Sequence, residues 1–246
     1  MAFKNGDMLL VNYSIYVKDS GELVDTTDEN VAKLHKKFEE GRIYEPELAI
    51  VGEGRFIKGF EEALSNADEL GRTYEVEIPP EKGYGERDPN KVRVLPTRAF
   101  IRSNITPEVG KEVTIDNMVG RIISVSGGRV TVDFNHPLAG KTLLIRFTVV
   151  KKLDDLIEKV KYLVKRRVRR ASLESIKVTY REDSNSVEVE LPKEFRLDEN
   201  IQIAKYLISR DISRWINQVK EVVFIERFES SEFKLGESVE QPKETA

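Results

Sequence analysis

Residues 48–64 constrain the fold of this chain more than any other segment. The segment opens with an apolar run at 49–51, which is typical of a short buried strand, and a glycine-rich turn at 52–54 ends it. Apolar residues then recur at helical spacing, which predicts a short helix with Phe60 on its buried face. Gly59 lies inside this helix, where glycine costs about 1 kcal/mol relative to alanine. Its missing Cβ indicates close approach of another group, and we favour packing of a strand over contact with a substrate.

The composition is that of a globular protein without metal or disulfide chemistry. The 246 residues are 39% hydrophobic and 34% charged, and they include no Cys and two His. These values exclude thiolate metal sites and disulfides, and we expect neither a cofactor nor a metal site. No apolar run is long enough to span a membrane, and the net charge of −3 argues against DNA as a partner. We expect a cytoplasmic protein with no membrane contact.

Alternating apolar residues predict the strands of a sheet. The alternation is clear at 8–17, resumes at 23–27 after a turn, and returns at 73–78 and 142–150. The charged segment 28–46 is rich in helix-forming residues and is expected to be a helical insertion above this sheet.

The character of the chain changes over residues 86–134. Short strands are predicted at 112–115, 119–125 and 129–134, and the last two are joined by the two-residue turn Gly127-Gly128. The segment therefore reads as a small, separate β domain inserted into the first sheet.

Five motifs in a fixed order carry a family resemblance. They are Tyr13, then Asp25-Thr26, then Gly52 to Leu64, then Pro-Pro-Glu-Lys-Gly-Tyr-Gly-Glu at 79–86, then Asn-His-Pro-Leu-Ala-Gly-Lys-Thr-Leu at 135–143. This order resembles the FKBP-type peptidyl-prolyl isomerases, and more narrowly the SlyD-like group in its long archaeal form. That group carries an insert-in-flap domain between its last two motifs, where residues 86–134 lie here.

The resemblance covers residues 1–151 and implies an α+β fold, with a bent antiparallel sheet around a short helix and an inserted small β domain. Beyond residue 151, the pattern of apolar residues over 152–228 predicts a C-terminal αββαβ domain. The expected domains are an FKBP-like isomerase domain (1–85 plus 135–151), an inserted flap or chaperone domain (86–134), a C-terminal α/β domain expected to dimerise (152–228) and a flexible tail (229–246).

The resemblance also implies a site. The FKBP pocket is an apolar cup, in which a few groups hydrogen-bond the carbonyls of the bound peptide. By motif position the catalytic residues are Asp25, Ile57 and Tyr84, and the substrate-binding residues are Tyr13, Phe56, Phe60, Leu138 and Ile145. Phe60 stands where many members have Trp, and Ile145 stands where many have Phe, so the shape of the cup is expected to differ.

The implied function is peptidyl-prolyl cis-trans isomerisation with a folding-chaperone role, by desolvation in the cup and without covalent chemistry. The alternative is a non-catalytic holdase or peptide-binding module that uses the same cup and the insert. The partners are unfolded or nascent polypeptides that contain proline. His136 invites a metal or base assignment, but a stabilised loop histidine beside Pro137 fits a chain with one other His better.

Two surfaces have open interpretations. In the insert, apolar side chains form either a groove for unfolded chains or the core of the small domain itself; these are Val113, Ile115, Met118, Val119, Ile122 and Ile123. In the C-terminal domain, a homodimer through residues 152–228 is expected. The basic cluster Lys165–Arg170 either contacts the ribosome or forms a solvated helix face, and we favour the solvated face.

Overall fold

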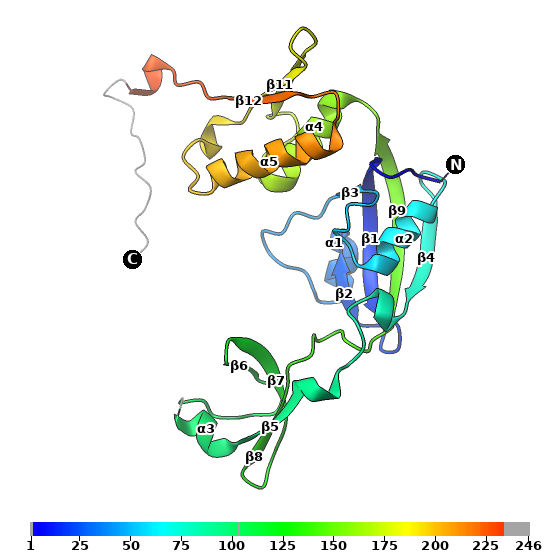
Figure 1. Cartoon of the computed structure of the whole chain (residues 1–246), viewed down its shortest axis with the longest axis vertical. Helices are drawn as coiled ribbons and strands as arrows, with labels where there is room; N and C mark the ends of the chain where they lie inside the picture. Colours follow the sequence, from blue (N-terminus) through cyan, green and yellow to red (C-terminus); the bar gives the residue numbers. More distant parts are fainter. Residues whose placement is uncertain (1, 103, 234–246) are drawn as a thin grey trace. The chain divides into compact units, whose positions relative to one another are not determined.

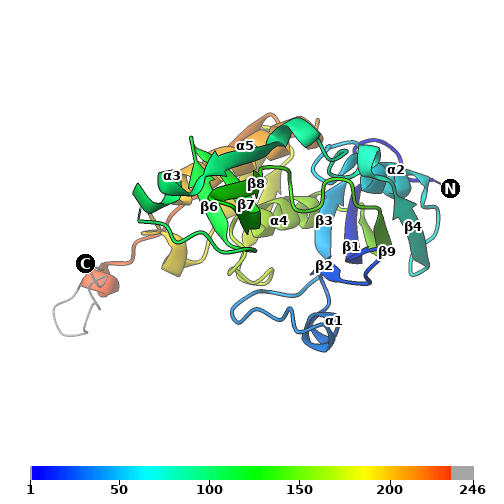
Figure 2. The ribbon, with the colours of Figure 1, turned by 90° about the horizontal axis from the view of Figure 1, so that it is seen from below.

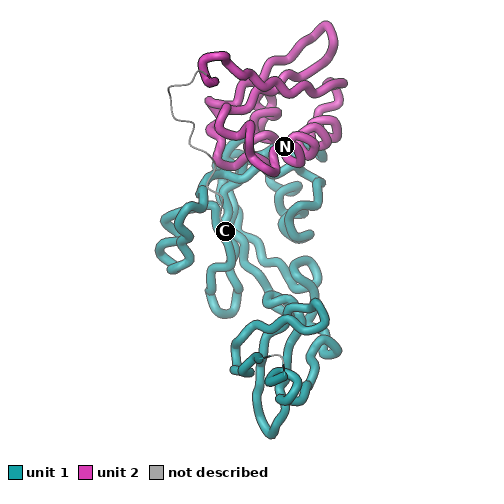
Figure 3. The backbone as a smooth tube through the Cα atoms, turned by 90° about the vertical axis from the view of Figure 1, so that its left-hand side faces the viewer, with its two compact units in different colours: residues 1–152 teal, residues 153–246 magenta. Residues whose placement is uncertain are grey.

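The computed structural model describes residues 2–102 and 104–233. The chain divides into two compact units, residues 1–152 and residues 153–246 (Figure 3). Its mixture of mainly antiparallel sheets and a few helices confirms the predicted α+β class. Within the described residues, no helix combines the length and the apolar composition that crossing a membrane requires.

The first unit is built on a five-stranded antiparallel sheet (Figure 1). The strands lie in the order β2-β1-β9-β4, and β3 also pairs with β1. Alternation of apolar residues explains these strands, because every second side chain of a strand faces the core. Their bounds are Met8–Val17 (β1), Leu23–Thr26 (β2), Glu47–Ile50 (β3), Thr73–Ile78 (β4) and Leu143–Leu153 (β9).

Strand β1 has two partners along the same edge. Its first half pairs with β3, with Val11 opposite Glu47, and its second half pairs with β2, with Ile15 opposite Asp25. Tyr13 lies between the two pairings, where its N–H donates to the Thr27 hydroxyl at 2.9 Å. Side chains from both partner strands can therefore converge on Tyr13.

Helix α2 (Lys58–Asn66) packs on one face of this sheet (Figures 1 and 2). Its glycine, Gly59, is buried, and a Cβ built on it would lie 2.6 Å from Cγ2 and 2.7 Å from Cδ1 of Ile78. Ile78 is the last residue of β4. The interpretation of Gly59 as a site of close strand–helix packing is therefore confirmed.

The helical insertion predicted for residues 28–46 is mostly wrong. Helix α1 covers only Glu29–Leu34, and the Asp28 carboxylate caps it by accepting the N–H groups of Asn30 and Val31. The chain then leaves helical geometry, because Lys36 adopts a positive φ of 56°. The remainder is a loop in which the rings of Phe38 and Tyr44 stack with their centroids 5.7 Å apart.

The inserted segment forms its own antiparallel sheet, in the order β5-β8-β7-β6. The three predicted strands are present, and a short helix that the sequence pattern did not indicate follows β5. A buried apolar cluster with Phe100 and Ile122 fills this sheet's core. The bounds are Val92–Pro96 (β5), Thr97–Arg102 (α3), Glu112–Ile115 (β6), Met118–Ser126 (β7) and Arg129–Asp133 (β8), and 3₁₀ turns cover Pro80–Lys82 and Pro89–Lys91.

The second unit has the predicted αββαβ order. Strands β10 and β11 are antiparallel and β12 is parallel to β11. The bounds are Leu156–Arg167 (α4), Lys177–Arg181 (β10), Ser186–Glu190 (β11), Ile201–Trp215 (α5) and Glu221–Ile225 (β12), and 3₁₀ turns cover Lys193–Phe195 and Ser230–Phe233. The predicted flexible tail lies, from residue 234 onward, outside the described residues.

A buried carboxylate joins the two helices of this unit. Asp211 of α5 accepts from Arg166 at 3.0 Å and from Arg167 at 2.5 Å, and the Arg166 side chain is only 5% exposed. Burial alone would raise the pKa of the Asp211 carboxyl, but the Arg167 hydrogen bond and the two guanidinium charges lower this pKa below its ordinary value. The expectation of a solvated basic face is therefore wrong for Arg166 and incomplete for Arg167.

Candidate functional site

The candidate site is built around an aromatic cluster between β1, α2 and β9. The ring of Phe60 meets those of Tyr13, Phe56 and Phe147 edge-on, with centroids 5.6, 5.0 and 5.4 Å apart. Tyr13 and Phe56 also meet edge-on, at 5.9 Å. Edge-to-face contacts of this kind fix ring orientations as well as burying area. The result is a rigid apolar wall in the first unit.

The predicted lining residues divide into a buried layer and a half-buried layer. Phe60 and Ile145 have no exposed surface, and Tyr13 is almost completely buried. Phe56, Ile57 and Leu138 are half-buried and pack against the same core. The structure thus brings all six together, and Phe56, Ile57 and Leu138 are the most exposed of them.

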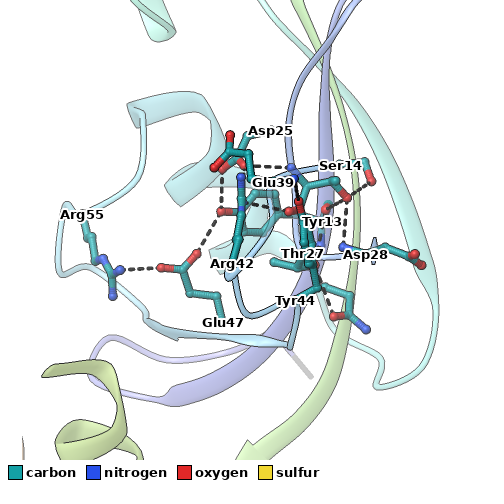
Figure 4. Close-up of polar contacts among 12 residues, drawn as sticks. Tyr13, Ser14, Asp25, Thr27, Asp28, Glu39, Arg42, Tyr44, Glu47 and Arg55 are labelled. Carbon is teal, nitrogen blue, oxygen red and sulfur yellow. Dashed lines mark hydrogen bonds and ion pairs between the residues drawn. The ribbon is translucent and has the colours of Figure 1, made fainter. Parts of the chain in front are cut away.

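The Tyr13 hydroxyl lies between two carboxylates (Figure 4). It is 3.0 Å from Oδ2 of Asp25 and 2.8 Å from Oε2 of Glu47. Each carboxylate is also paired with an arginine, Asp25 with Arg42 at 2.5 Å and Glu47 with Arg55. Burial and then the negative charges of Glu47 and Asp25 raise the pKa of Tyr13 far above its ordinary value, so its hydroxyl stays protonated.

Strand register explains why these carboxylates meet at one hydroxyl. Directly opposed residues of antiparallel strands present their side chains to the same face. Glu47 opposes Val11 and Asp25 opposes Ile15, and both β1 residues share the face of Tyr13. The two partner strands of β1 therefore place one carboxylate on each side of Tyr13.

Ile57 occupies a position suited to hydrogen bonding through its backbone. It is the N-cap residue of α2, with φ −59° and ψ 147°, and its carbonyl accepts the N–H of Phe60 at 2.9 Å. The N–H of an N-cap residue is not used by the helix itself. The preceding N–H, that of Phe56, donates to the Glu61 carboxylate at 3.0 Å, which holds the entry of the helix.

Tyr84 lies in a loop outside the buried cluster. Its side chain is 36% exposed, and its ring stacks on that of His136 with centroids 4.3 Å apart and planes within 3°. His136 in turn accepts the N–H of Leu138 at its Nδ1, at 3.1 Å. These two contacts fit the interpretation of His136 as a stabilised loop histidine, because they link Tyr84 to Leu138, a half-buried residue of the cluster.

Three charged residues of the site, Arg42, Glu47 and Arg55, were not among those predicted from the sequence. Arg42 comes from the segment expected to be helical, and Glu47 precedes an apolar strand in which a lone acid carries no periodic signal. The pairing of Glu47 with Val11 places this acid next to Tyr13, and no local pattern in the sequence indicates that pairing.

Comparison with known protein families matches most of the chain. The model for FKBP-type peptidyl-prolyl cis-trans isomerase matches residues 1–101. The model described as the IF domain of FKBP26 matches residues 93–138, and the model described as FKBP26 C-terminal matches residues 157–229.

Individual relatives carry related names. A short-type peptidyl-prolyl cis-trans isomerase of Methanocaldococcus jannaschii is 42% identical over 146 residues, which are 59% of this chain and 90% of the relative. An FKBP-type isomerase SlyD of Helicobacter pylori is 33% identical over 146 residues, covering 57% of this chain and 70% of the relative. The SlyD of Haemophilus influenzae is 28% identical over 164 residues, covering 65% and 77%.

Proposed function

The chain belongs to the FKBP-type peptidyl-prolyl cis-trans isomerases, and from this premise we propose that the aromatic cluster around Phe60 is the cup in which it rotates X-Pro bonds. The observation that carries the assignment of the cup is the convergence of six predicted lining residues on one cluster. Asp25 joins that cluster through the Tyr13 hydroxyl. The substrates are polypeptides that contain proline.

The reaction needs only modest stabilisation of its transition state. Rotation about the peptide bond faces a barrier of about 18–20 kcal/mol because the C–N bond has partial double-bond character. An acceleration of about 10³-fold requires about 4 kcal/mol. The twisted amide loses conjugation and is less dipolar than the planar amide, so an apolar wall that excludes water favours it.

Each residue then has a defined part. The rings of Phe56 and Phe60 supply the apolar wall, with Phe60 supporting from below. The N–H of Ile57 and the hydroxyl of Tyr84 donate to peptide carbonyls, and the Asp25 carboxylate accepts. No nucleophile or proton transfer is required, because no covalent bond changes.

Proline-limited refolding of a model protein and isomerisation of a short X-Pro peptide test this assignment. We expect Tyr84→Phe to lower kcat/KM a few-fold and Asp25→Ala to lower it about tenfold, because the first removes a hydrogen bond between neutral groups and the second removes a hydrogen bond to a charged group. Ile57→Asp should lower it at least 100-fold, because a carboxylate on the apolar wall attracts water into the cup. Circular dichroism of each variant controls for loss of the fold.

A different ranking would count against the mechanism. If Asp25→Ala abolished turnover and Ile57→Asp spared it, desolvation would not be the main effect. If the wild-type chain suppressed aggregation of an unfolded protein but never accelerated the short peptide, the holdase alternative would replace the isomerase assignment.

We also propose that the insert (residues 86–134) holds unfolded chains. Of the six apolar residues considered for a groove, Val113 and Ile122 are buried in the core of the insert, whereas Val119 is 63% and Ile123 is 40% exposed. An exposed apolar strand can bind unfolded segments. The two exposed side chains support a holding surface on β7.

The remaining partners stay proposals. A homodimer through residues 152–228 has support from exposed apolar side chains on α5, where Ile203 is 60% and Tyr206 is 69% exposed. The mass of the intact chain by light scattering decides the oligomeric state. Contact of the basic cluster Lys165–Arg170 with the ribosome is an alternative that nothing tests here. A cytoplasmic location is a separate prediction.

A further inference from the structure

The Tyr13 hydroxyl faces more hydrogen-bond acceptors than it can serve. A tyrosine hydroxyl carries one hydrogen, and an ionised carboxylate only accepts. The two carboxylate oxygens at 3.0 and 2.8 Å therefore compete for the same hydrogen. The carboxylate that does not receive this hydrogen has an oxygen to which Tyr13 donates no hydrogen bond.

Two features favour Glu47 as the acceptor. Its oxygen is the nearer one, at 2.8 Å against 3.0 Å. Its side chain is 22% exposed and that of Asp25 is 35% exposed, so water competes less for Glu47. Both carboxylates also have donors at the other oxygen, which are Arg42 and the N–H of Thr26 for Asp25 and Arg55 for Glu47.

The oxygen left over is Oδ2 of Asp25. In the part of the chain that the structure describes, its only hydrogen-bond donor is the Tyr13 hydroxyl. A carboxylate oxygen that is partly exposed and without a donor is a strong acceptor for a peptide N–H. We propose that Glu47 is a positioning residue, which takes the Tyr13 hydrogen and thereby leaves Asp25 Oδ2 to accept an N–H of the bound peptide.

This inference rests on the proposed function and adds a substrate preference to it. The preferred substrate offers a free N–H on the residue before or after its proline. A peptide methylated at that nitrogen keeps the X-Pro bond but loses the hydrogen bond to Asp25. Hydrogen bonds to charged groups contribute enough that we expect kcat/KM of the wild type to fall about tenfold for one of the two methylated peptides.

Glu47→Gln is the informative substitution. The Arg55 guanidinium, which only donates, should take the amide oxygen of Gln and turn the amide NH₂ towards Tyr13. That NH₂ donates to the Tyr13 oxygen, so the hydroxyl hydrogen must go to Asp25. We expect the tenfold methylation penalty to shrink to about twofold in this variant, because Asp25 is then occupied.

A double variant separates positioning from a structural role. Tyr13→Phe keeps the ring in the aromatic cluster and removes the hydroxyl, so Asp25 Oδ2 is free whatever residue stands at 47. The combination of Tyr13→Phe with Glu47→Gln should therefore restore the methylation penalty to about tenfold. If Glu47→Gln instead acted by disturbing the apolar wall, the additional Tyr13→Phe substitution would not restore the methylation penalty.

The measurement is kcat/KM for the parent peptide and its two N-methylated forms, with the uncatalysed rate subtracted. Equal penalties in the wild type and Glu47→Gln would overturn the inference, as would a double variant that stays at about twofold or a wild type without any penalty. Failure of the proposed function looks different, because the wild type would then not accelerate the parent peptide.

Discussion

Gly59→Ala tests the closest contact between α2 and the sheet. The new Cβ would lie 2.6 Å from Cγ2 and 2.7 Å from Cδ1 of Ile78, and 3.3 Å from Cβ of Lys82. Ile78 is 4% exposed and cannot turn its side chain out to solvent. The contact therefore has to be relieved by moving the helix away from β4 or by forcing Ile78 off its rotamer.

Two opposing effects set the size of the change. Alanine is favoured over glycine inside a helix by about 1 kcal/mol. An extra methyl group in a filled core costs about 1–3 kcal/mol. We expect a net loss of up to about 2 kcal/mol in the free energy of unfolding of the first unit.

The background Ile78→Ala should reverse the sign. That substitution removes both Ile78 atoms that the Cβ would meet, although it costs about 2–5 kcal/mol by itself. In this background Gly59→Ala should stabilise the protein by about 1 kcal/mol, the intrinsic helix preference alone. The double-mutant cycle therefore predicts a coupling between residues 59 and 78.

A local measurement is needed, because a chain of two units need not unfold in one step. Hydrogen exchange of the amides in α2 and β4 gives the free energy of opening where the change is made. If Gly59→Ala had the same sign and size in both backgrounds, the steric explanation of this glycine would be refuted.

Two further variants, one of them a double variant, probe the rest of the chain. Asp211→Asn should destabilise the second unit by about 3 kcal/mol, because it removes the buried negative charge that pairs with Arg166 and Arg167; urea unfolding followed by Trp215 fluorescence measures this. Because the folded pKa of Asp211 is lowered, the wild type gains stability above pH of about 4 and loses it below, and this loss should be smaller in the variant. Replacing Val119 and Ile123 with Ser should weaken suppression of aggregation several-fold and leave short-peptide turnover unchanged.

The strands could be predicted from the sequence because their signal is local. The alternation at 8–17 and at 73–78 matches β1 and β4 residue for residue, since one face of each strand packs on the core. Helix α1 could not be bounded in this way. Residues 35–46 have an amino-acid composition typical of a helix. The helix nevertheless ends before Lys36, which adopts a positive φ, and the loop that follows places Arg42 in an ion pair with Asp25.

The apolar residues of the cluster and Asp25 could be placed from the sequence motifs, whereas Arg42, Glu47 and Arg55 could not. Phe60, Phe56 and Ile57 belong to one short motif, so a resemblance over that motif places them together. The contact between Glu47 and Tyr13 depends on the register of two strands that are 34 residues apart in the sequence. No local pattern encodes such a register, since a shift of one residue would turn Glu47 to the other face.

The four charged residues beside Tyr13, which are Asp25, Arg42, Glu47 and Arg55, form a rim, and this rim limits where water can be excluded from a bound peptide. Asp25 and Glu47 are each paired with an arginine, so the rim carries no net charge, but it holds four partly exposed polar side chains that water can reach. Within the aromatic cluster, by contrast, Phe60 has no exposed surface and Tyr13 is almost completely buried. We therefore propose that the preference for a less dipolar, twisted amide arises at the aromatic layer, and that the rim orients the peptide through directed hydrogen bonds. Substitutions in the layer should slow every substrate alike, and substitutions at the rim should discriminate between substrates by their N–H groups.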